Sequence, residues 1–457
     1  MHPSQKSNHL KPILRTTIFL KDTSNGKLSY KNGQPTIQLL IGAQDRMIVP
    51  GSIRLCGKFT VVKKMNGANP IIPLETDEIR MNERLGVYSM IDTLSIFSQS
   101  SGQTIETINH HNRMMSSYLS VTQSQQDFSA QSYESALRFP NYKAQQLGVV
   151  TNTQGATASG GDSANSFCIP LVCGLFLGQE PIPLSSQWGV GGLNIEIQLA
   201  PDQQVLFSGD NTDTRLVDSF YELSDVRLIC EVQRPAGADL ARIEKQTTNT
   251  FTYNSISSYY NTINSANAML NFNLGLKSVL SAFMNVVPAG HINNFKRDGL
   301  ATLEFTNTDG SNAEIEQLVF TRAGMREPLE YNIDTLQRNA GSGNETADAQ
   351  VVRNYMNAVM SFAKIKRTSV EPSVFRNIDY SVDSSFSGAK TIVNGGAAFG
   401  VGVAYDGISD QGVDFSNAAF GVQLQLRLNT DHPNAIYLFI HSRQTVVSSG
   451  GSIQVLK

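Results

Sequence analysis

The stretch GVQLQLRLN, from Gly421 to Asn429, alternates apolar and polar side chains. Leu424, Leu426 and Leu428 fall on one face of an extended chain, and the polar residues between them fall on the other. Successive side chains of a β-strand point to opposite faces of its sheet, so this pattern predicts a strand with one face packed on a core. The stretch favours an all-β fold in which sheets cover one another.

Other parts of the chain have the length and composition of strands, and they are separated by clusters of Gly, Ser, Asn and Thr. Short strands between such turn clusters are typical of β-sandwiches and barrels. The clearest are RLCGKFTVV (Arg54 to Val62), LNIEIQLA (Leu193 to Ala200), DVRLICEVQ (Asp225 to Gln233) and IYLFIHS (Ile436 to Ser442).

Helical spacing is rare in this sequence. The positions of Ile108, Met115 and Leu119 predict a helix over Thr104 to Ser124, and a second is predicted over Ala349 to Ala363. We expect these helices to be insertions between strands. The Gly-, Ser- and Thr-rich stretches Thr151 to Ser166 and Asn339 to Ala349 are expected to form exposed loops.

Length and composition limit the classes of protein. The chain has 457 residues, of which 40% are hydrophobic and 16% charged, and its formal net charge is -3. This length favours two domains, and the charged fraction lies below the roughly 25% of ordinary soluble domains. Bulk charge gives no sign of specific nucleic-acid binding. A surface poor in charge indicates that much of it is neutral and polar or is covered by partners.

The N-terminal sequence and the apolar runs predict neither a signal peptide nor a membrane-spanning helix. The start MHPSQKSNHLKP lacks the apolar core of a signal peptide, and the longest apolar runs have the length of strands. We therefore expect synthesis in the cytosol or nucleus.

A seam between two units of similar size is predicted near Arg234 to Thr250, where Pro and Gly end a strand and polar residues follow. The expected organisation is an N-terminal arm over residues 1–45, a first sandwich over 46–234, a linker over 235–250 and a second sandwich over 251–457. The segment Met1 to Leu40 is mildly basic and is expected to be a solvated tail. In an assembly, the alternatives are a tie to neighbouring copies or a contact with an anionic inner layer.

Motifs of catalysis and cofactor binding are absent from the sequence, including GxSxG, GxxxxGK[ST], HExxH and a GxGxxG that opens a helix. We therefore assign no catalytic, cofactor-binding or metal-binding residue and expect no enzyme. The four cysteines contain no CxxC pair, and buried free thiols are expected. The alternative is a zinc site formed by Cys168, Cys173 and a distant histidine.

Several polar or aromatic residues could have either a structural role or a functional one. His110 and His111 are adjacent, so on a helix they point about 100° apart and are expected to be one packed and one solvated ring. Asp406, Asp410 and Asp414 are expected to form a polar turn, with a bound cation as the alternative. The single tryptophan, Trp188, is either an interface anchor or a plug beneath a loop.

Six segments resemble the double jelly-roll major capsid proteins of the lineage of adenovirus, tailless membrane-containing phages, virophages and large DNA viruses. The likeness is nearest to polinton-like viruses and virophages, and it depends on the order and spacing of the segments. They are VPGSIRLCGKFTV (Val49 to Val61), Leu85 to Ser116 running from a strand into a helix, Phe167 to Ala200 with its IPL turn, YELSDVRLICEVQ (Tyr221 to Gln233), Ser258 to Val287, and Gly412 to Val455.

The resemblance implies two tandem jelly-roll β-sandwiches with short helices in loops. It implies a structural protein of the virion that assembles into pseudo-hexameric homotrimers, which tile an icosahedral shell. Its implied partners are neighbouring trimers, a penton protein and minor capsid proteins, with an internal membrane as a further candidate, and no cofactor.

Two other readings of the residues remain open. A carbohydrate-binding or adhesin-like β-sandwich shares the alternating strands and the Asn- and Gly-rich loops. An enzyme on a sandwich scaffold would need paired carboxylates on facing strands, and no such pair stands out.

Overall fold

The computed structural model describes most of both halves of the chain. The described residues are 15–21, 27–31, 33, 35–62, 79–82, 85–122, 136, 165–178, 180–208, 219–295, 299–300, 315–327, 333–334, 361, 402–405, 412–426 and 433–457.

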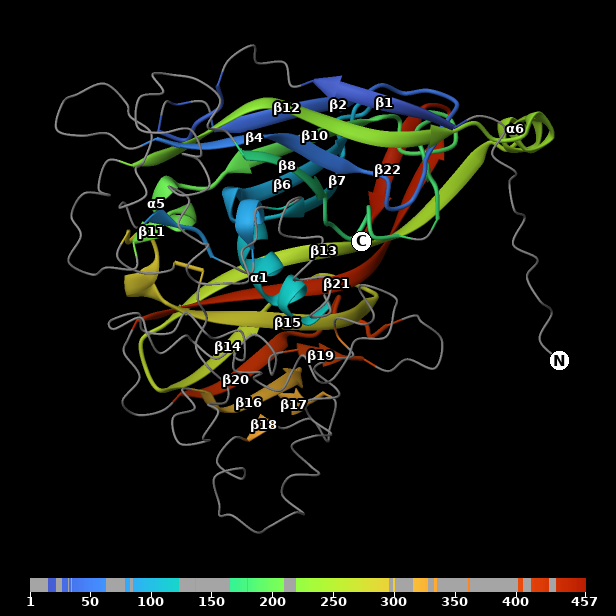
Figure 1. The fold of residues 1–457 in the computed structure, drawn as a ribbon. Coiled ribbons are helices and arrows are strands. Elements are labelled where there is room, and N and C mark those ends of the chain that lie inside the picture. Colours follow the sequence, from blue (N-terminus) through green and yellow to red (C-terminus); the bar gives the residue numbers. More distant parts are fainter. Residues whose placement is uncertain are drawn as a thin grey trace, which may run out of the picture.

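The first sandwich is formed by two antiparallel sheets from the first half of the chain (Figure 1). One has the order β8-β4-β12-β3-β9, with β1 also paired to β12; the other has the order β2-β10-β6-β7, and a small separate pair is β11-β5. Their bounds are β1 Arg15–Lys21, β2 Thr36–Ile41, β3 Met47–Ile48, β4 Arg54–Val62, β5 Ile79–Arg80, β6 Ile91–Ser98, β7 Thr104–Ile108, β8 Asn165–Pro170, β9 Ile182–Pro183, β10 Leu193–Leu199, β11 Phe207–Ser208 and β12 Phe220–Gln233.

The second sandwich is formed by two antiparallel sheets from the second half of the chain. One has the order β13-β21-β15-β19 with β22 paired to β21, and the other has the order β14-β20-β16-β17 with β18 paired to β16. Their bounds are β13 Thr248–Ile263, β14 Asn267–Phe272, β15 Val279–Pro288, β16 Ile315–Arg322, β17 Met325–Arg326, β18 Ile333–Asp334, β19 Gly402–Ala404, β20 Phe420–Leu426, β21 Asn434–Ser449 and β22 Ser452–Leu456.

In the described part of the chain, the helices are short and join or cover strands. They are η1 Gly86–Met90, α1 His111–Thr122, α5 Asp202–Val205, α6 Gly237–Glu244 and η3 Ala289–His291. No helix in the described part of the chain is long and apolar enough to span a bilayer. The two sandwiches, with short helices in their connections, confirm the predicted all-β class.

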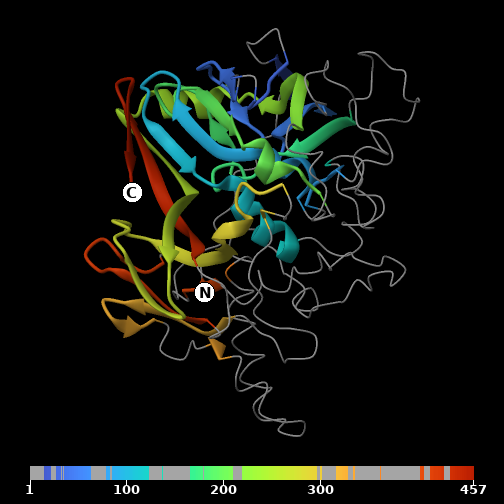
Figure 2. The same cartoon turned by 90° about the vertical axis from the view of Figure 1, so that its left-hand side faces the viewer.

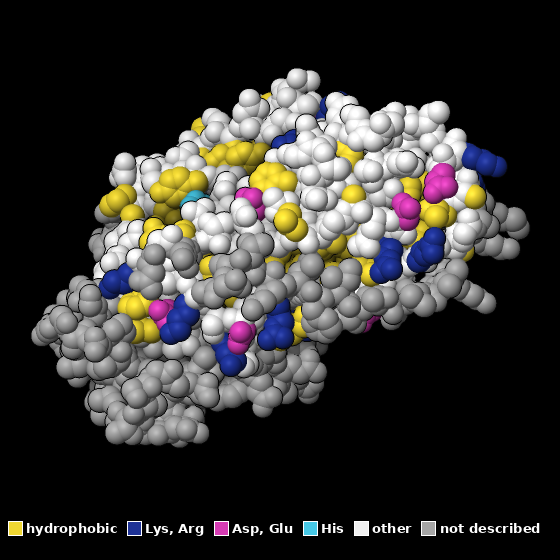
Figure 3. Space-filling view, turned by 90° about the horizontal axis from the view of Figure 1, so that it is seen from above, with side chains coloured by type: hydrophobic (Ala, Val, Ile, Leu, Met, Phe, Trp, Pro, Cys, Tyr) yellow, Lys and Arg dark blue, Asp and Glu magenta, His cyan; other side chains and the backbone are white. Residues whose placement is uncertain are grey.

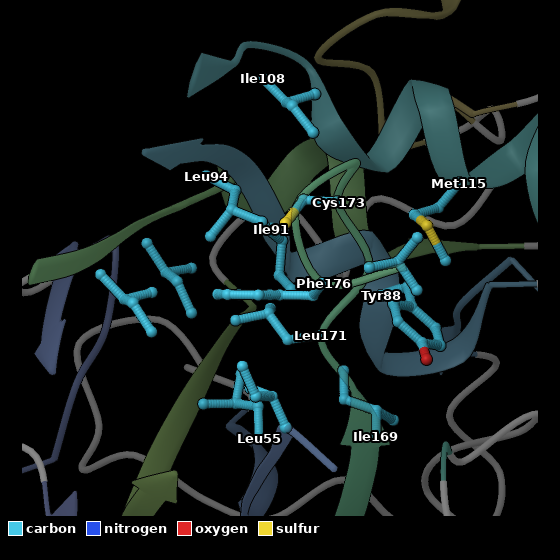
Figure 4. Close-up of a cluster of buried hydrophobic side chains, with 14 of the residues drawn as sticks. Leu55, Tyr88, Ile91, Leu94, Ile108, Met115, Ile169, Leu171, Cys173 and Phe176 are labelled. Atoms are coloured by element: carbon cyan, nitrogen blue, oxygen red, sulfur yellow. The ribbon is translucent and has the colours of Figure 1, made fainter. Parts of the chain in front are cut away.

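Alternation along the strands builds the cores. In β20, Val422, Leu424 and Leu426 are buried while Gln423 and Gln425 are half-buried, which confirms the face predicted for this stretch. Figure 4 shows the core of the first sandwich, where side chains from β4, β6, β7, β8 and α1 meet those of the loop after β8. Phe176 of that loop lies among them and fills the space between the sheets (Figure 4).

Strand β21 is buried on both of its faces over its first half. Ile436 and Leu438 pack into the core of the second sandwich, whereas Tyr437 and Phe439 pack into the core that reaches the first sandwich. Figures 1 and 2 both place α1 between the strands of the first half and the sheet of β21. This double burial explains why the predicted strand IYLFIHS is an apolar run rather than an alternating one.

One predicted element is wrong in part. The helix expected over Thr104 to Ser124 begins only at His111, because residues Thr104–Ile108 form strand β7, which pairs with β6. The β-branched Thr and Ile of this segment favour the strand. His110, with a φ of 56°, turns the chain from the strand into the helix.

Other expectations fall partly or wholly outside the described residues. Of the helix expected over Ala349 to Ala363, only Ser361 is described. Of the loop expected over Thr151 to Ser166, only the last two residues are described, and they begin strand β8 instead of belonging to a loop. The loop expected over Asn339 to Ala349 lies outside the described residues. Within the expected arm, residues 1–45, the structure places strands β1, paired with β12, and β2, paired with β10. Within the expected linker, residues 235–250, it places α6 and the start of β13.

Candidate functional site

A group of buried, hydrogen-bonded polar side chains lies at the junction between the two sandwiches. This junction is formed by β7, α1 and the loop Leu171–Gly178 of the first half, and by β13, β15 and β21 of the second half. Tyr253 of β13 donates a hydrogen bond from its hydroxyl to the Ile105 carbonyl oxygen at 2.7 Å. The backbone N–H of Asn109 donates to the Ser258 hydroxyl at 2.8 Å. These bonds connect β7 and the turn after it to β13.

Glu106 is the acidic group at the centre of the junction, and its side chain is buried. Its carboxylate accepts hydrogen bonds from the backbone N–H groups of Gly174 and Leu175, each at 2.9 Å, and from that of Ile256 at 2.6 Å. Burial raises the pKa of Glu106 to about 7, against the lowering effect of these three bonds. One carboxylate thus joins a strand, a loop and the second sandwich.

Arg113 of α1 is the basic group of the junction and is also buried. Its guanidinium donates a hydrogen bond to the Gly299 carbonyl oxygen. The same group lies over the ring of Tyr437 of β21, with 5.2 Å between the guanidinium carbon and the ring centroid, a cation–π contact. Arg113 therefore connects helix α1 to two separate segments of the second half.

Asn285 of β15 binds α1 at Arg113, Ser116 and Ser117. Its amide nitrogen donates to the Arg113 carbonyl oxygen and, at 3.1 Å, to the Ser116 hydroxyl. Its amide oxygen accepts a hydrogen bond from the Ser117 hydroxyl. Such a set of buried partners fixes the position of a helix on a sheet more narrowly than apolar contact does.

The two adjacent histidines differ in burial, as expected. His111 is buried, and its Nε2 lies 2.7 Å from the Val172 carbonyl oxygen, so Nε2 carries the proton and donates it. Burial lowers the pKa of His111 to about 4, which keeps the ring neutral. The side chain of His110 is 37% exposed and lies 3.4 Å from the Asp92 carboxylate.

The other residues that the sequence suggested as a zinc site, a cation site or an interface anchor do not form such a site among the described residues. Cys168 lies beside Cys56 and not beside Cys173, and no group of three or more metal-binding side chains occurs among the residues that the structure describes. Trp188 is buried within the chain itself, which favours the plug. Asp414 is exposed and accepts a hydrogen bond from the Ser416 N–H, while positions 406 and 410 lie outside the described residues.

Sequence reasoning did not identify the junction residues. The available signals were a glutamate within the strand TIETI and an arginine in the first turn of the helix that carries Met115 and Leu119. Both charges interrupt a segment that is otherwise buried, and a buried charge requires partners. Their partners in the second half of the chain, however, are Ile256 and Gly299, which lie 150 and 186 residues away.

The described surface that is seen from above is poor in charge (Figure 3). On the face seen from above, charged side chains are scattered singly or in small groups among neutral polar and apolar ones (Figure 3). This is the surface expected from the small charged fraction of the sequence.

Comparisons with known proteins find the likeness in structure and not in sequence. No protein-family profile matches the sequence, and no curated protein matches it. Among solved structures, the Faustovirus major capsid protein matches with a TM-score of 0.55 at 9% identity, over 98% of this chain and 93% of that one.

Two further solved structures match over similar lengths. A chain of the Sputnik virophage matches with a TM-score of 0.53 at 14% identity, over 97% of this chain and 88% of that one. A chain of the PBCV-1 virus capsid matches with a TM-score of 0.53 at 10% identity, over 97% of both chains. The two packed sandwiches of this chain thus have the double jelly-roll fold found in viral major capsid proteins such as that of Faustovirus.

Proposed function

We propose that this chain is a major capsid protein, a structural protein of the virion that assembles with copies of itself into a shell. The observation that carries the proposal is the match to the Faustovirus, Sputnik and PBCV-1 chains over nearly the full length of both partners. It covers both sandwiches, so the arrangement of the two is shared and not merely the fold of each one.

The junction supplies a physical reason why such a chain suits a shell. A wall built of repeated blocks needs each block to hold its shape, because an error in the angle between its halves would accumulate across many contacts. Glu106, Arg113 and Asn285 bind the sandwiches together through buried hydrogen bonds with fixed directions. The two sandwiches therefore act as one rigid wedge.

We infer that three such chains form a pseudo-hexameric capsomer. Two similar sandwiches in one chain give six similar units in a homotrimer, and closed cyclic symmetry limits its growth. Six-sided blocks then tile the faces of an icosahedral shell. A surface with few charges suits contacts between blocks, because neutral polar groups meet across a seam with a smaller desolvation cost than ions.

The same proposal covers the organisation and partners of the chain. Residues 46–234, completed by strands β1 and β2, act as the first jelly roll, and residues 251–457 act as the second. Residues 235–250 join the two. Partners would be neighbouring trimers, a penton protein and minor capsid proteins, and an internal membrane is a further candidate. The role is structural and not catalytic, and the protein is made in the host cytoplasm or nucleus before it enters the virion.

Light scattering during size-exclusion chromatography, followed by negative-stain microscopy, tests the proposal. We expect a species of three times the chain mass at micromolar concentration, and six-sided blocks in the images. A stable monomer that binds glycans would favour the carbohydrate-binding sandwich instead and would overturn the capsid role.

A further inference from the structure

Two cysteines face each other across adjacent strands of the first sandwich. Cys56 of β4 and Cys168 of β8 are direct partners in the antiparallel register, and their sulfur atoms lie 2.8 Å apart. Directly opposed residues of an antiparallel pair have Cα atoms about 4.5–5.5 Å apart, within the roughly 4.4–6.8 Å that a disulfide spans. Neither backbone has to move for the two sulfurs to bond.

Both thiols are on the outer face of the sheet and not in its core. Along β4 and β8, Leu55 and Ile169 are buried in the core, and the alternating side chains at Cys56 and Cys168 point the other way. Cys168 is partly exposed, whereas Cys56 is 9% exposed. A small disulfide can therefore reach the sulfur of Cys168 from solvent.

The neighbouring pair holds these strands in place. Gly57 is opposite Phe167, and a Cβ built on Gly57 would lie 3.0 Å from the Phe167 ring. The ring thus packs closely over the glycine backbone. This packing fixes the spacing of β4 and β8 beside the two thiols.

Charge near the pair modifies its reactivity. Burial and the neighbouring Cys168 thiol raise the pKa of Cys56, whereas Arg227 and Arg54 lower it. Both arginines are exposed on the same sheet, where they would also attract an anionic disulfide. Cys168 is the more exposed of the two thiols, so it reacts first with a disulfide from solvent, and Cys56 resolves the intermediate.

We propose that Cys56 and Cys168 form a reversible disulfide between β4 and β8 when the protein meets a small-molecule disulfide such as oxidised glutathione. The Cys168 thiolate attacks one sulfur of the oxidant, forming a mixed disulfide and releasing one glutathione thiolate. The Cys56 thiolate then attacks the Cys168 sulfur and releases the second glutathione. The two protein thiols lose two electrons and two protons, and these convert the oxidant into two glutathione thiols.

The other two cysteines are not part of this device. Cys173 and Cys230 are fully buried, and burial raises the pKa of each thiol. The pair would remain reduced in the cytosol and close in an oxidising medium outside the cell. The disulfide follows from the strand register alone and does not rest on the proposed function.

Mass spectrometry of the full chain before and after incubation with oxidised glutathione tests the proposal. Under denaturing conditions the reduced protein should present four thiols to an alkylating reagent, the number of cysteines in the sequence. After oxidation two should remain, and a proteolytic digest should contain a peptide that joins Cys56 to Cys168. The thermal midpoint should rise by several degrees, because the bond closes a loop between residues 112 positions apart.

Variants separate the two steps of the reaction. Cys56→Ser should retain a glutathione adduct on Cys168, Cys168→Ser should form neither adduct nor cross-link, and the matched control Cys230→Ala should form the cross-link normally. The proposal is overturned if the wild-type protein keeps four reactive thiols, if the mixed disulfide on Cys168 never closes, or if the cross-link joins other cysteines. These three overturning outcomes are all measured on the wild-type protein, so they do not depend on whether a variant folds.

Discussion

The carboxylate of Glu106, on β7 of the first sandwich, accepts a 2.6 Å hydrogen bond from the backbone N–H of Ile256, on β13 of the second sandwich. The same carboxylate binds two N–H groups of the loop after β8. Glu106 belongs to one segment and binds two others, so the positions of the three segments depend on one another. The angle between the sandwiches is therefore set by a few buried polar groups as well as by the apolar core around them.

Replacement of Glu106 by alanine should destabilise the fold strongly. Three buried backbone N–H groups would lose their acceptor, and each such loss costs about 1–3 kcal/mol. We expect the free energy of unfolding to fall by at least about 3 kcal/mol in chemical denaturation. Glu244→Ala, at an exposed position of α6, should change it by less than about 0.5 kcal/mol. Equal effects of the two variants would contradict the role of Glu106.

The contribution of Glu106 should depend on pH. Burial raises its pKa from 4.5 to about 7 in the folded state, so the folded chain binds more protons than the unfolded chain between these values. This contribution to stability is complete below pH 4.5 and is lost as the pH rises through 7. The stability of the wild-type protein relative to Glu106→Gln should fall by roughly 3 kcal/mol from pH 4.5 to pH 8. A difference that stays constant over this range would show that the folded carboxyl has an ordinary pKa.

His111 should act in the opposite direction over the same range. Burial lowers its pKa from 6.5 to about 4, so stability is present above pH 6.5 and is lost as the pH falls toward 4. In His111→Gln, the amide nitrogen can take the place of Nε2 as donor to the Val172 carbonyl oxygen without titrating. The advantage of the wild-type protein over this variant should shrink between pH 7 and pH 4 in thermal unfolding curves. An advantage that does not change with pH would mean that the imidazole is not buried in its neutral form.

A methyl group at Gly174 should separate the loop after β8 from β13. A Cβ there would lie 2.6 Å from the Asn254 carbonyl oxygen and from the Ser255 Cα, both of which are backbone atoms. We expect Gly174→Ala to lower the free energy of unfolding by about 1–3 kcal/mol or more, and to reduce the yield of capsomers measured by light scattering.

Gly42→Ala is the matched control for this substitution. A Cβ on Gly42 has no heavy atom within 4 Å beyond its chain neighbours. Its stability and capsomer yield should remain close to those of the wild-type protein. If Gly174→Ala behaves like this control, the loop and β13 are not in close contact in solution.

The N-terminal segment can be tested by two truncations. Removal of residues 1–40 would delete β1 and most of β2, including the buried Ile37 and Leu39, so this variant should not fold. Removal of residues 1–14 leaves both strands intact. We expect this shorter truncation to form capsomers but fewer closed particles in electron micrographs, as a tie between neighbours requires. Normal particle yield would exclude a role of residues 1–14 in joining neighbours.

The strands could be predicted from the sequence because their signal is local. Val422, Leu424 and Leu426 alternate with polar residues, and a period-2 pattern can bury one face only as a strand. The segment Thr104 to Ile108 was harder, because Ile108 also fits the helical spacing of the residues that follow it. There the pairing with β6 decides the structure.

The sequence by itself determined that this chain forms tandem β-sandwiches, since alternation and turn residues act between near neighbours in the chain. Only the tertiary structure decided how the sandwiches are joined. It brings Glu106 to Ile256 and Arg113 to Gly299, and it places Cys56 opposite Cys168. These partners are more than 100 residues apart in the chain, and no local pattern records which distant backbone will satisfy a buried charge.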